Sequence, residues 1–190
     1  YQSALQGNSN ALNNLGFCFK TGKGVEQNYS KAFEYYEQSS EKGNSNALYN
    51  IGVCYYKGEG VEQSYIKAVE YYQKSSDKGN SHALNDLGFC YHFGNGVEQN
   101  FILAANYYLK SSELQNSDAL NNLGFCYKKG IGVEKNDLKA FELYQKSAQK
   151  GNPSAYNNLG FCYMRGEGVE KDLKKAVEFF EKASEKGNSF

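Results

Sequence analysis

Three kinds of residue in this sequence have types and spacings that could do chemistry. Cysteine recurs at positions 18, 54, 90, 126 and 162. The histidines, His82 and His92, could ligate a metal. The spacing Ser-x-x-Lys, with which penicillin-interacting enzymes place an amine beside a nucleophilic hydroxyl, occurs at Ser39–Lys42, Ser75–Lys78 and Ser147–Lys150.

None of these patterns favours catalysis or metal binding. His82 and His92 fall near the two ends of one predicted helix, and ten residues at a rise of 1.5 Å span about 15 Å, which is too far for one metal. Lysine near a helix C-terminus is explained by the helix dipole, and Ser-Asp-Asn does not accompany the Ser-x-x-Lys pairs. The sequence therefore predicts no catalytic residue, no metal site and no cofactor. A penicillin-recognising hydrolase stays as an alternative.

The cysteines are predicted to be free thiols. They occupy one position per repeat on the apolar side of a predicted helix, and equivalent Cα atoms in stacked helices lie about 10 Å apart. That separation exceeds the reach of about 7 Å for a disulfide. Free thiols favour a reducing compartment, so we expect a cytoplasmic location. The sequence shows no signal or transmembrane segment, although a secretory compartment is not excluded.

All of these residues belong to a unit that recurs every 36 residues without insertion or deletion. Segments 11–18 and 119–126 are identical, and equivalent alanines stand at 11, 47, 83, 119 and 155. Such a fixed period indicates stacked supersecondary units. The sequence predicts one solenoid over 1–190, in which a tail of a preceding repeat, 1–10, is followed by repeats at 11–46, 47–82, 83–118, 119–154 and 155–190. Asn188 would cap a further helix, so both ends are expected to be cut from a longer array.

The first part of each unit has the pattern of a helix. Apolar residues follow one helix face at Ala11, Leu12, Leu15, Cys18 and Phe19. Asparagine precedes this pattern as an N-cap at 8, 44, 80, 116 and 152, and Pro153 suits a first helical position. Glycine ends it at 22, 58, 94, 130 and 166.

A second helix follows a Gly-x-Gly-Val turn. Its N-cap is expected at 28, 64, 100, 136 or 172, where the sequence has Asn, Ser, Asn, Asn or Asp. Its buried face is predicted to hold Tyr29, Ala32, Phe33, Tyr36 and Ser39, and its end is expected at Gly43. The unit is thus a helical hairpin.

The unit closely resembles the Sel1-like repeat, a relative of the tetratricopeptide repeat. The pattern is Ala-x3-Leu-Gly-x2-Tyr-x2-Gly-x-Gly-Val, then Lys-Ala-x2-Tyr-Tyr-x-Lys-Ser. The second copy departs from it only at Ile51 and otherwise carries Ala47, Gly52, Tyr55, Gly58, Gly60, Val61, Lys67, Ala68, Tyr71, Tyr72, Lys74 and Ser75. This resemblance covers essentially the whole chain. It implies an all-α, right-handed α-solenoid of helix-turn-helix repeats and a non-enzymatic role as scaffold or adaptor.

The resemblance also suggests where a partner would bind. In the tetratricopeptide fold the first helices line a concave groove that holds peptide, and helical phase places Asn13, Phe17 and Lys20 on the face away from Leu15. The expected groove has two polar rows and an apolar row: Asn13, Tyr49, Asn85, Asn121 and Asn157; Asn14, Asn50, Asp86, Asn122 and Asn158; and Phe17, Val53, Phe89, Phe125 and Phe161. Asparagine amides can pair with a peptide backbone. The alternative is structural, because the same side chains could bond neighbouring helices.

A basic strip is expected at one end of the groove, at Lys20, Lys57, Lys128, Lys129 and Arg165. It could receive an acidic segment or a terminal carboxylate, or it could serve only the helix dipole. In the third repeat, Phe93, Leu103 and Gln115 replace residues typical of the other copies, and they could form a partner contact.

The balance of charge limits the class of partner. Lys and Arg number 21 and Asp and Glu number 21, so the formal net charge is zero, and no global field attracts nucleic acid. No apolar run approaches the roughly 20 residues of a membrane helix. The sequence therefore predicts a protein or extended peptide as partner, and neither nucleic acid nor membrane. The alternative is structural self-association, in which uncapped repeats stack end to end.

Overall fold

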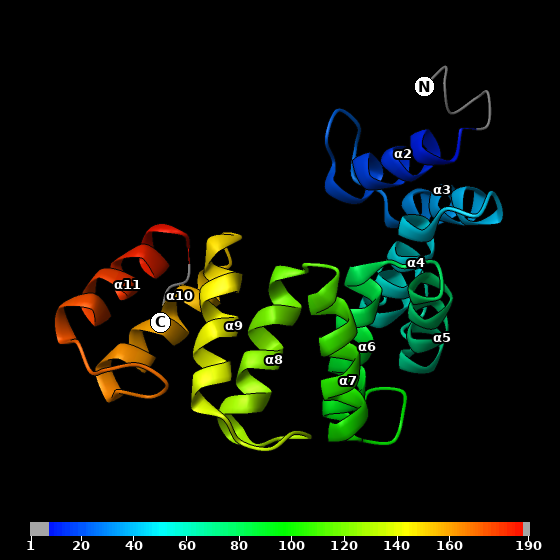
Figure 1. The fold of residues 1–190 in the computed structure, drawn as a ribbon. Helices are drawn as coiled ribbons and strands as arrows, with labels where there is room; N and C mark the ends of the chain where they lie inside the picture. Colours follow the sequence, from blue (N-terminus) through cyan, green and yellow to red (C-terminus); the bar gives the residue numbers. More distant parts are fainter. Residues whose placement is uncertain (1–7, 188–190) are drawn as a thin grey trace. The chain divides into compact units, whose positions relative to one another are not determined.

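The computed structural model describes residues 8–187, and the regular secondary structure of that range is entirely helical (Figure 1). The helices run in chain order as α2 (Ser9–Thr21), α3 (Tyr29–Glu41), α4 (Ser45–Lys57), α5 (Tyr65–Ser76), α6 (Ser81–Phe93), α7 (Phe101–Glu113), α8 (Ser117–Lys129), α9 (Asp137–Gln149), α10 (Pro153–Arg165) and α11 (Leu173–Glu185). Of the expected tail 1–10, only residues 8–10 are described, and Ser9 and Asn10 already belong to α2. The expected cap Asn188 lies outside the described residues.

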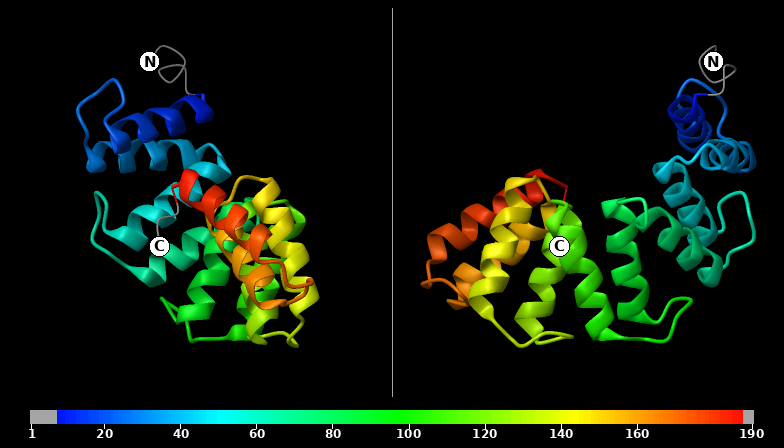
Figure 2. Two further views of the ribbon diagram at one scale, coloured as in Figure 1. Left: turned by 90° about the vertical axis from the view of Figure 1, so that its left-hand side faces the viewer. Right: turned by 45° about the vertical axis from the view of Figure 1, so that its right-hand side comes forward.

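The chain forms two compact units that divide between Gln99 and Asn100. In the first unit α2 packs along α3 and α4 along α5 as antiparallel hairpins, α3 contacts α4, and α5 contacts α6 (Figure 2). In the second unit α7 packs against α8, the pairs α8–α9 and α10–α11 form hairpins, and α9 contacts α10. The predicted all-α solenoid of helical hairpins is confirmed.

Side chains and glycines delimit the helices where the sequence predicts. The amide oxygen of Asn44 accepts the backbone N–H of Ala47, and Asn8, Asn80, Asn116 and Asn152 cap their helices in the same way. The second helices begin after the N-caps Asn28, Ser64, Asn100, Asn136 and Asp172. The first helices end at left-handed glycines such as Gly58, whose φ is 73°. Pro153 occupies the first turn of α10.

The hairpins α2–α3, α4–α5 and α8–α9 are each held together by a close approach of their two helices. A Cβ on Gly52 would lie 2.6 Å from the ring of Tyr72, so only glycine lets α4 lie against that ring. At the other end of the hairpin the buried Ser75 hydroxyl donates to the carbonyl oxygen of Ser45 at 2.7 Å, and Ser39 and Ser147 do the same to Ser9 and Ser117. In each of these hairpins the helix–helix contact therefore combines a large ring against a glycine with one hydrogen bond from a buried serine hydroxyl.

Tyr29 corrects one detail of the predicted buried face. Ala32, Phe33, Tyr36 and Ser39 are buried in α3, but Tyr29 is 39% exposed. It is the first residue of the helix, and its hydroxyl accepts a hydrogen bond from Gln27 Nε2 at 3.0 Å. The ring therefore packs over the inter-helix loop instead of the core.

Candidate functional site

A pocket of about 290 Å³ opens between α4 and α6 in the first unit. Helix α4 contributes residues at the spacing of one helical face, because Tyr49, Val53 and Tyr56 are four and three residues apart. The walls are completed by Lys57 at the end of α4, by Asp86 and Phe89 on α6, and by Tyr72 on α5. Tyr49, Val53, Asp86 and Phe89 are expected groove positions, and the structure brings these four residues together around one pocket.

The two polar rows lie close enough to bond each other. Asn50 Nδ2 donates to Asn13 Oδ1 at 2.9 Å, and Asn158 Nδ2 donates to Asn121 Oδ1 at 2.8 Å. Each of these half-buried pairs joins the first helices of two successive hairpins. In these two pairs the geometry supports the structural alternative that the sequence left open.

The sequence did not predict a second row of asparagine pairs. Asn44 caps α4 with its oxygen while its Nδ2 donates to Asn10 Oδ1 at 2.8 Å. Asn80 bonds Asn46 at 2.9 Å, and Asn152 bonds Asp118 at 2.7 Å. The available signal was the polar residue two places after each cap, at 10, 46 and 118.

The other members of the polar rows differ in their surroundings. Asn14 is exposed on α2. Asn85 Nδ2 donates to Asp86 Oδ1 at 3.0 Å, and Asn122 is half-buried on α8. Asn157 Oδ1 is buried without a hydrogen-bond partner among residues 8–187. The polar rows are therefore not equivalent from repeat to repeat.

The apolar row stays accessible on the first helices. Phe17 is 46% exposed, and Phe89 and Phe125 are each 38% exposed. Val53 is half-buried in the pocket wall. Phe161 is more enclosed, because it meets Phe180 edge to face at 5.1 Å and lies under the Arg165 guanidinium at 5.2 Å.

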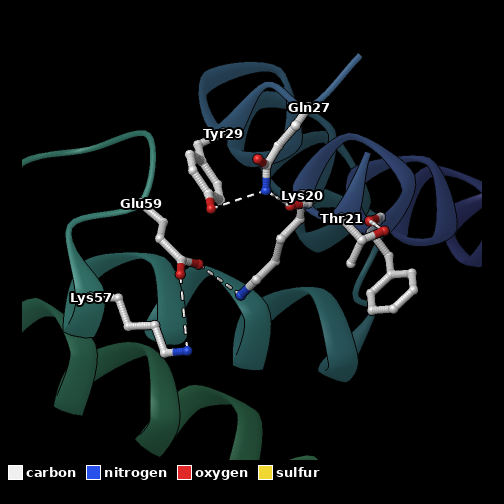
Figure 3. A network of polar contacts seen from close by, with 7 residues as sticks. Lys20, Thr21, Gln27, Tyr29, Lys57 and Glu59 are labelled. Atoms are coloured by element: carbon white, nitrogen blue, oxygen red, sulfur yellow. Dashed lines mark hydrogen bonds and ion pairs between the residues drawn. The ribbon is translucent and has the colours of Figure 1, made fainter. Parts of the chain in front are cut away.

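Acidic residues in the inter-helix turns offset most of the expected basic strip, and Figure 3 shows Glu59 beside Lys20 and Lys57. Glu59 lies 2.9 Å from Lys20 Nζ and 3.9 Å from Lys57 Nζ. In the second unit Glu167 pairs with Lys128 and lies 4.0 Å from Arg165. Lys129 is exposed and has no ion pair within the described chain. Sequence reasoning missed both glutamates, although each stands between the two turn glycines of the following repeat.

The serines of the Ser-x-x-Lys pairs are structural. Ser39, Ser75 and Ser147 are buried, and each hydroxyl already donates to a main-chain carbonyl. The sequence also contains Lys20-Thr21-Gly22, a Lys-Thr-Gly triplet that our sequence reasoning overlooked. Lys20 pairs with Glu59, Thr21 Oγ1 donates to Phe17 O at 2.8 Å, and Gly22 terminates α2 (Figure 3). The triplet therefore serves a helix end.

The cysteines are free, and four of them are fully buried. Burial raises the pKa of Cys54, Cys126 and Cys162 to about 11 and that of Cys90 to about 12. These thiols keep their protons at neutral pH and are poor nucleophiles. Within residues 8–187 no group of three His, Cys, Asp or Glu side chains could hold a metal ion. No helix of that range is long and apolar enough to cross a membrane.

The family model described as Sel1 repeat matches the chain five times, at residues 9–44, 45–80, 81–116, 117–152 and 153–188. The chain belongs to the Sel1 repeat family. Each match begins at the first residue of a first helix, two residues before the repeat boundary expected from the alanines. Sel1 repeats are generally protein-interaction scaffolds of the tetratricopeptide-like superfamily, and the family fold is typically non-catalytic.

Solved structures share this Sel1 fold. A Sel1 repeat protein from Oxalobacter formigenes is 30% identical with a TM-score of 0.87, over 96% of this chain and 73% of that one. A protective antigen of uropathogenic Escherichia coli strains is 32% identical with a TM-score of 0.84, over 97% of this chain and 40% of that one. Cysteine rich protein B of Helicobacter pylori is 30% identical with a TM-score of 0.51, over 64% and 86% of the two chains. The comparison with curated proteins returned no significant match.

Proposed function

We propose that this Sel1 repeat chain is a non-enzymatic scaffold that binds an extended peptide of a partner protein across the first helices of its hairpins. The observation that carries the proposal is the pocket between α4 and α6, which is lined by residues of both first helices. Its volume of about 290 Å³ lies near the lower end of the range of roughly 300 to 1,000 Å³ for ligand sites. It has room for one side chain of a longer ligand.

The surface around the pocket offers further contacts for such a peptide. Phe17 and Phe89 expose apolar rings on first helices of the same unit, and an exposed ring can take an apolar side chain. Asn14 is exposed and carries both donor and acceptor groups for a peptide backbone. Anchoring side chains in pockets while the main chain is bonded by amides is a general mode of peptide recognition.

The groups that could have acted as nucleophiles support a non-catalytic role. The hydroxyl of Ser39 is buried against Ser9 O, and the thiols of Cys54 and Cys90 are buried and keep their protons. Turnover of a chromogenic β-lactam by the purified protein would contradict this part of the proposal.

A selection from a displayed library of random nonapeptides tests the binding role. It is run on the protein, on Val53→Arg, which places a long charged side chain in the pocket, and on the control Val177→Arg. Val177 is 55% exposed on α11, in the other unit. We expect peptides selected by the parent to bind Val53→Arg at least tenfold more weakly and Val177→Arg equally well.

Two results would overturn the proposal. Either no peptide is enriched, or the enriched peptides bind Val53→Arg as tightly as the parent. Light scattering of the protein at two concentrations is measured alongside, because a mass that grows with concentration would favour end-to-end self-association instead.

The free cysteines support a reducing, cytoplasmic location for this scaffold. Fractionation of cells that produce the protein, with a maleimide label on denatured samples, tests it. Five labelled thiols in the cytoplasmic fraction are expected, and recovery of the protein outside the cytoplasm would contradict it.

A further inference from the structure

Aromatic rings make up most of the pocket wall. Tyr49 and Tyr72 have ring centroids 5.8 Å apart and tilted planes, while Tyr56 meets Phe89 at 6.5 Å with nearly perpendicular planes. The pocket is thus bounded by four rings from three helices. Ring faces carry partial negative charge, and they attract cations placed within about 6 Å of the centroid.

Asp86 supplies the formal negative charge of this wall. Its Oδ1 accepts a hydrogen bond from Asn85 Nδ2 at 3.0 Å. Burial and, after it, the neighbouring Asp86 carboxylate raise the pKa of Tyr72. The pKa of Tyr56 is raised mainly by burial, then by Cys90 and Tyr65, and Asp86 adds a smaller contribution. The two tyrosines are therefore neutral at physiological pH, and their environment includes a nearby carboxylate.

The lysine of the pocket lies at its edge and is directed toward another partner. Lys57 Nζ is 3.9 Å from Glu59 Oε1, and its side chain is 55% exposed (Figure 3). Lys20 contacts the same Glu59 carboxylate at 2.9 Å. The Glu59 turn thus attracts both amines, while the Asp86 carboxylate belongs to the aromatic wall.

This combination occurs in one repeat pair. The residue equivalent to Asp86 is asparagine in the four other copies, at 14, 50, 122 and 158. The residue equivalent to Tyr49 is asparagine at 13, 85, 121 and 157. Repeat two therefore departs from the other copies at one of the polar-row positions that line this pocket, and repeat three departs at the other.

We propose that the pocket between α4 and α6 takes a cationic side chain, lysine or arginine, of the bound peptide, with Asp86 as its counter-ion and the rings of Tyr49, Tyr56, Tyr72 and Phe89 around its charged group. This inference rests on the proposed peptide-binding function. Aromatic walls with one carboxylate suit a weakly hydrated cation, because the rings replace part of its water while the carboxylate balances its charge. Lys57, which belongs to the basic strip and lines the pocket, is directed toward Glu59 and takes no part in this contact.

The test uses the nonapeptides selected by the parent protein. We expect lysine or arginine to be enriched at one position of the selected set. Each winning peptide is then titrated beside a version with glutamine at that position, against the parent, Asp86→Asn and the control Glu34→Gln. Asp86→Asn installs the residue found in the other four copies, so the fold is expected to be kept, and a melting curve verifies it.

We expect Asp86→Asn to bind the cationic peptide about tenfold more weakly and the glutamine version within twofold of the parent. A tenfold loss corresponds to about 1.4 kcal/mol, close to the lower end of the range for a hydrogen bond to a charged group. Glu34→Gln, which removes one negative charge from the exposed surface of α3 outside the pocket, is expected to leave both affinities unchanged.

The possible failures are distinguishable. Enriched peptides without a basic position, or with an acidic one, or with equal affinity for Asp86→Asn, would overturn the cation pocket and leave the peptide-binding function standing. Absence of any enriched peptide would overturn both.

Discussion

At the residue scale, Gln115 holds a backbone conformation that is unfavourable for a residue with a side chain. Its φ of 62° is the one positive value of a non-glycine residue in the described part of the chain, and the equivalent residues Gly43, Gly79 and Gly151 have φ of 79° to 83°. A side chain in this region costs roughly 1 kcal/mol. We expect Gln115→Gly to raise the free energy of unfolding by about that amount.

Gly151→Gln is the matched reverse change. A Cβ at Gly151 would meet no described atom within 4 Å, so backbone strain alone should lower stability by about 1 kcal/mol. Urea unfolding of both variants and the parent measures the two changes. Equal midpoints for all three proteins would show that this turn is not strained by a side chain.

The buried thiols make the free energy of unfolding depend on pH in the alkaline range. Below pH 9.0 a thiol is protonated in both the folded and the unfolded chain. Above it the unfolded chain loses the proton, while the folded thiols of Cys54, Cys126 and Cys162 keep it up to about pH 11. Stability is therefore lost as pH rises through this window, by about 1.4 kcal/mol per pH unit for each thiol.

Urea unfolding at pH 8, 9, 10 and 10.5 measures this slope. The slope should be smaller in Cys126→Ala, which has one titrating thiol fewer, whatever its stability at pH 8. The buried tyrosines Tyr36 and Tyr144, whose pKa burial also raises, add to the slope of both proteins. A free energy of unfolding that stays constant between pH 8 and 10.5 would contradict the prediction.

At the scale of elements, the inter-helix turns touch the preceding hairpin. A Cβ on Gly60 would lie 2.4 Å from the carbonyl oxygen of Tyr29, the first residue of α3. Gly24 has a similar φ, 75° against 79°, but its Cβ would meet no described atom within 4 Å. Gly60→Ala should therefore destabilise the chain by about 1 to 3 kcal/mol more than Gly24→Ala, because two backbones must move apart.

Chemical unfolding of the two variants gives the difference. Both carry the same strain of alanine at positive φ, so that contribution cancels. Equal losses of unfolding free energy in the two variants would mean that α3 and the turn of the α4–α5 hairpin can move apart without destabilising the fold.

Successive hairpins are also joined by a pair of side chains 39 residues apart. The pair is Lys20 with Glu59 in one junction and Tyr56 with Asn95, at 2.8 Å, in the next. Lys20 pairs with a carboxylate and Tyr56 with an amide, so neither residue would pair equally well with the partner of the other. Lys20→Tyr and Glu59→Asn should each cost about 1 kcal/mol, and the double variant should recover at least about 0.5 kcal/mol of the sum, because it rebuilds the Tyr–Asn pair.

A double-mutant cycle measured by thermal or urea unfolding provides the coupling. Lys31→Tyr combined with Glu59→Asn is the control. Lys31 is exposed on α3 and its amine lies over the ring of Phe19 in its own hairpin, so a tyrosine there should not rebuild the Tyr–Asn pair. If the costs of Lys20→Tyr and Glu59→Asn simply add, the junction has no pairing preference.

At the scale of the whole molecule, the period and the cap residues were sufficient to predict the hairpins. Asn44 and Gly58 mark helix ends by local geometry that any such segment shares, and helical phase together with the tetratricopeptide resemblance predicted Tyr49 and Phe89 for one groove face. The Lys20–Glu59 pair could not be predicted in this way, because it depends on the offset between stacked hairpins, which the period does not contain. For the same reason the sequence left open whether Asn50 bonds a ligand or Asn13.

Ion pairs within the fold determine how strongly the basic residues of this neutral chain can attract a polyanion. The formal net charge is zero, and Glu59 and Glu167 offset Lys20, Lys57, Lys128 and Arg165 within the fold. Affinity for a polyanion grows with the number of its charges that the protein neutralises, and it falls steeply with salt.

We therefore expect the protein to pass through a heparin column at about 0.15 M salt. The variant Glu59→Gln/Glu167→Gln, which frees the four cations and gains two units of charge, should be retained and elute later. Retention of the parent above about 0.5 M salt would show that the turn glutamates do not offset the strip, and would return nucleic acid to the classes of partner.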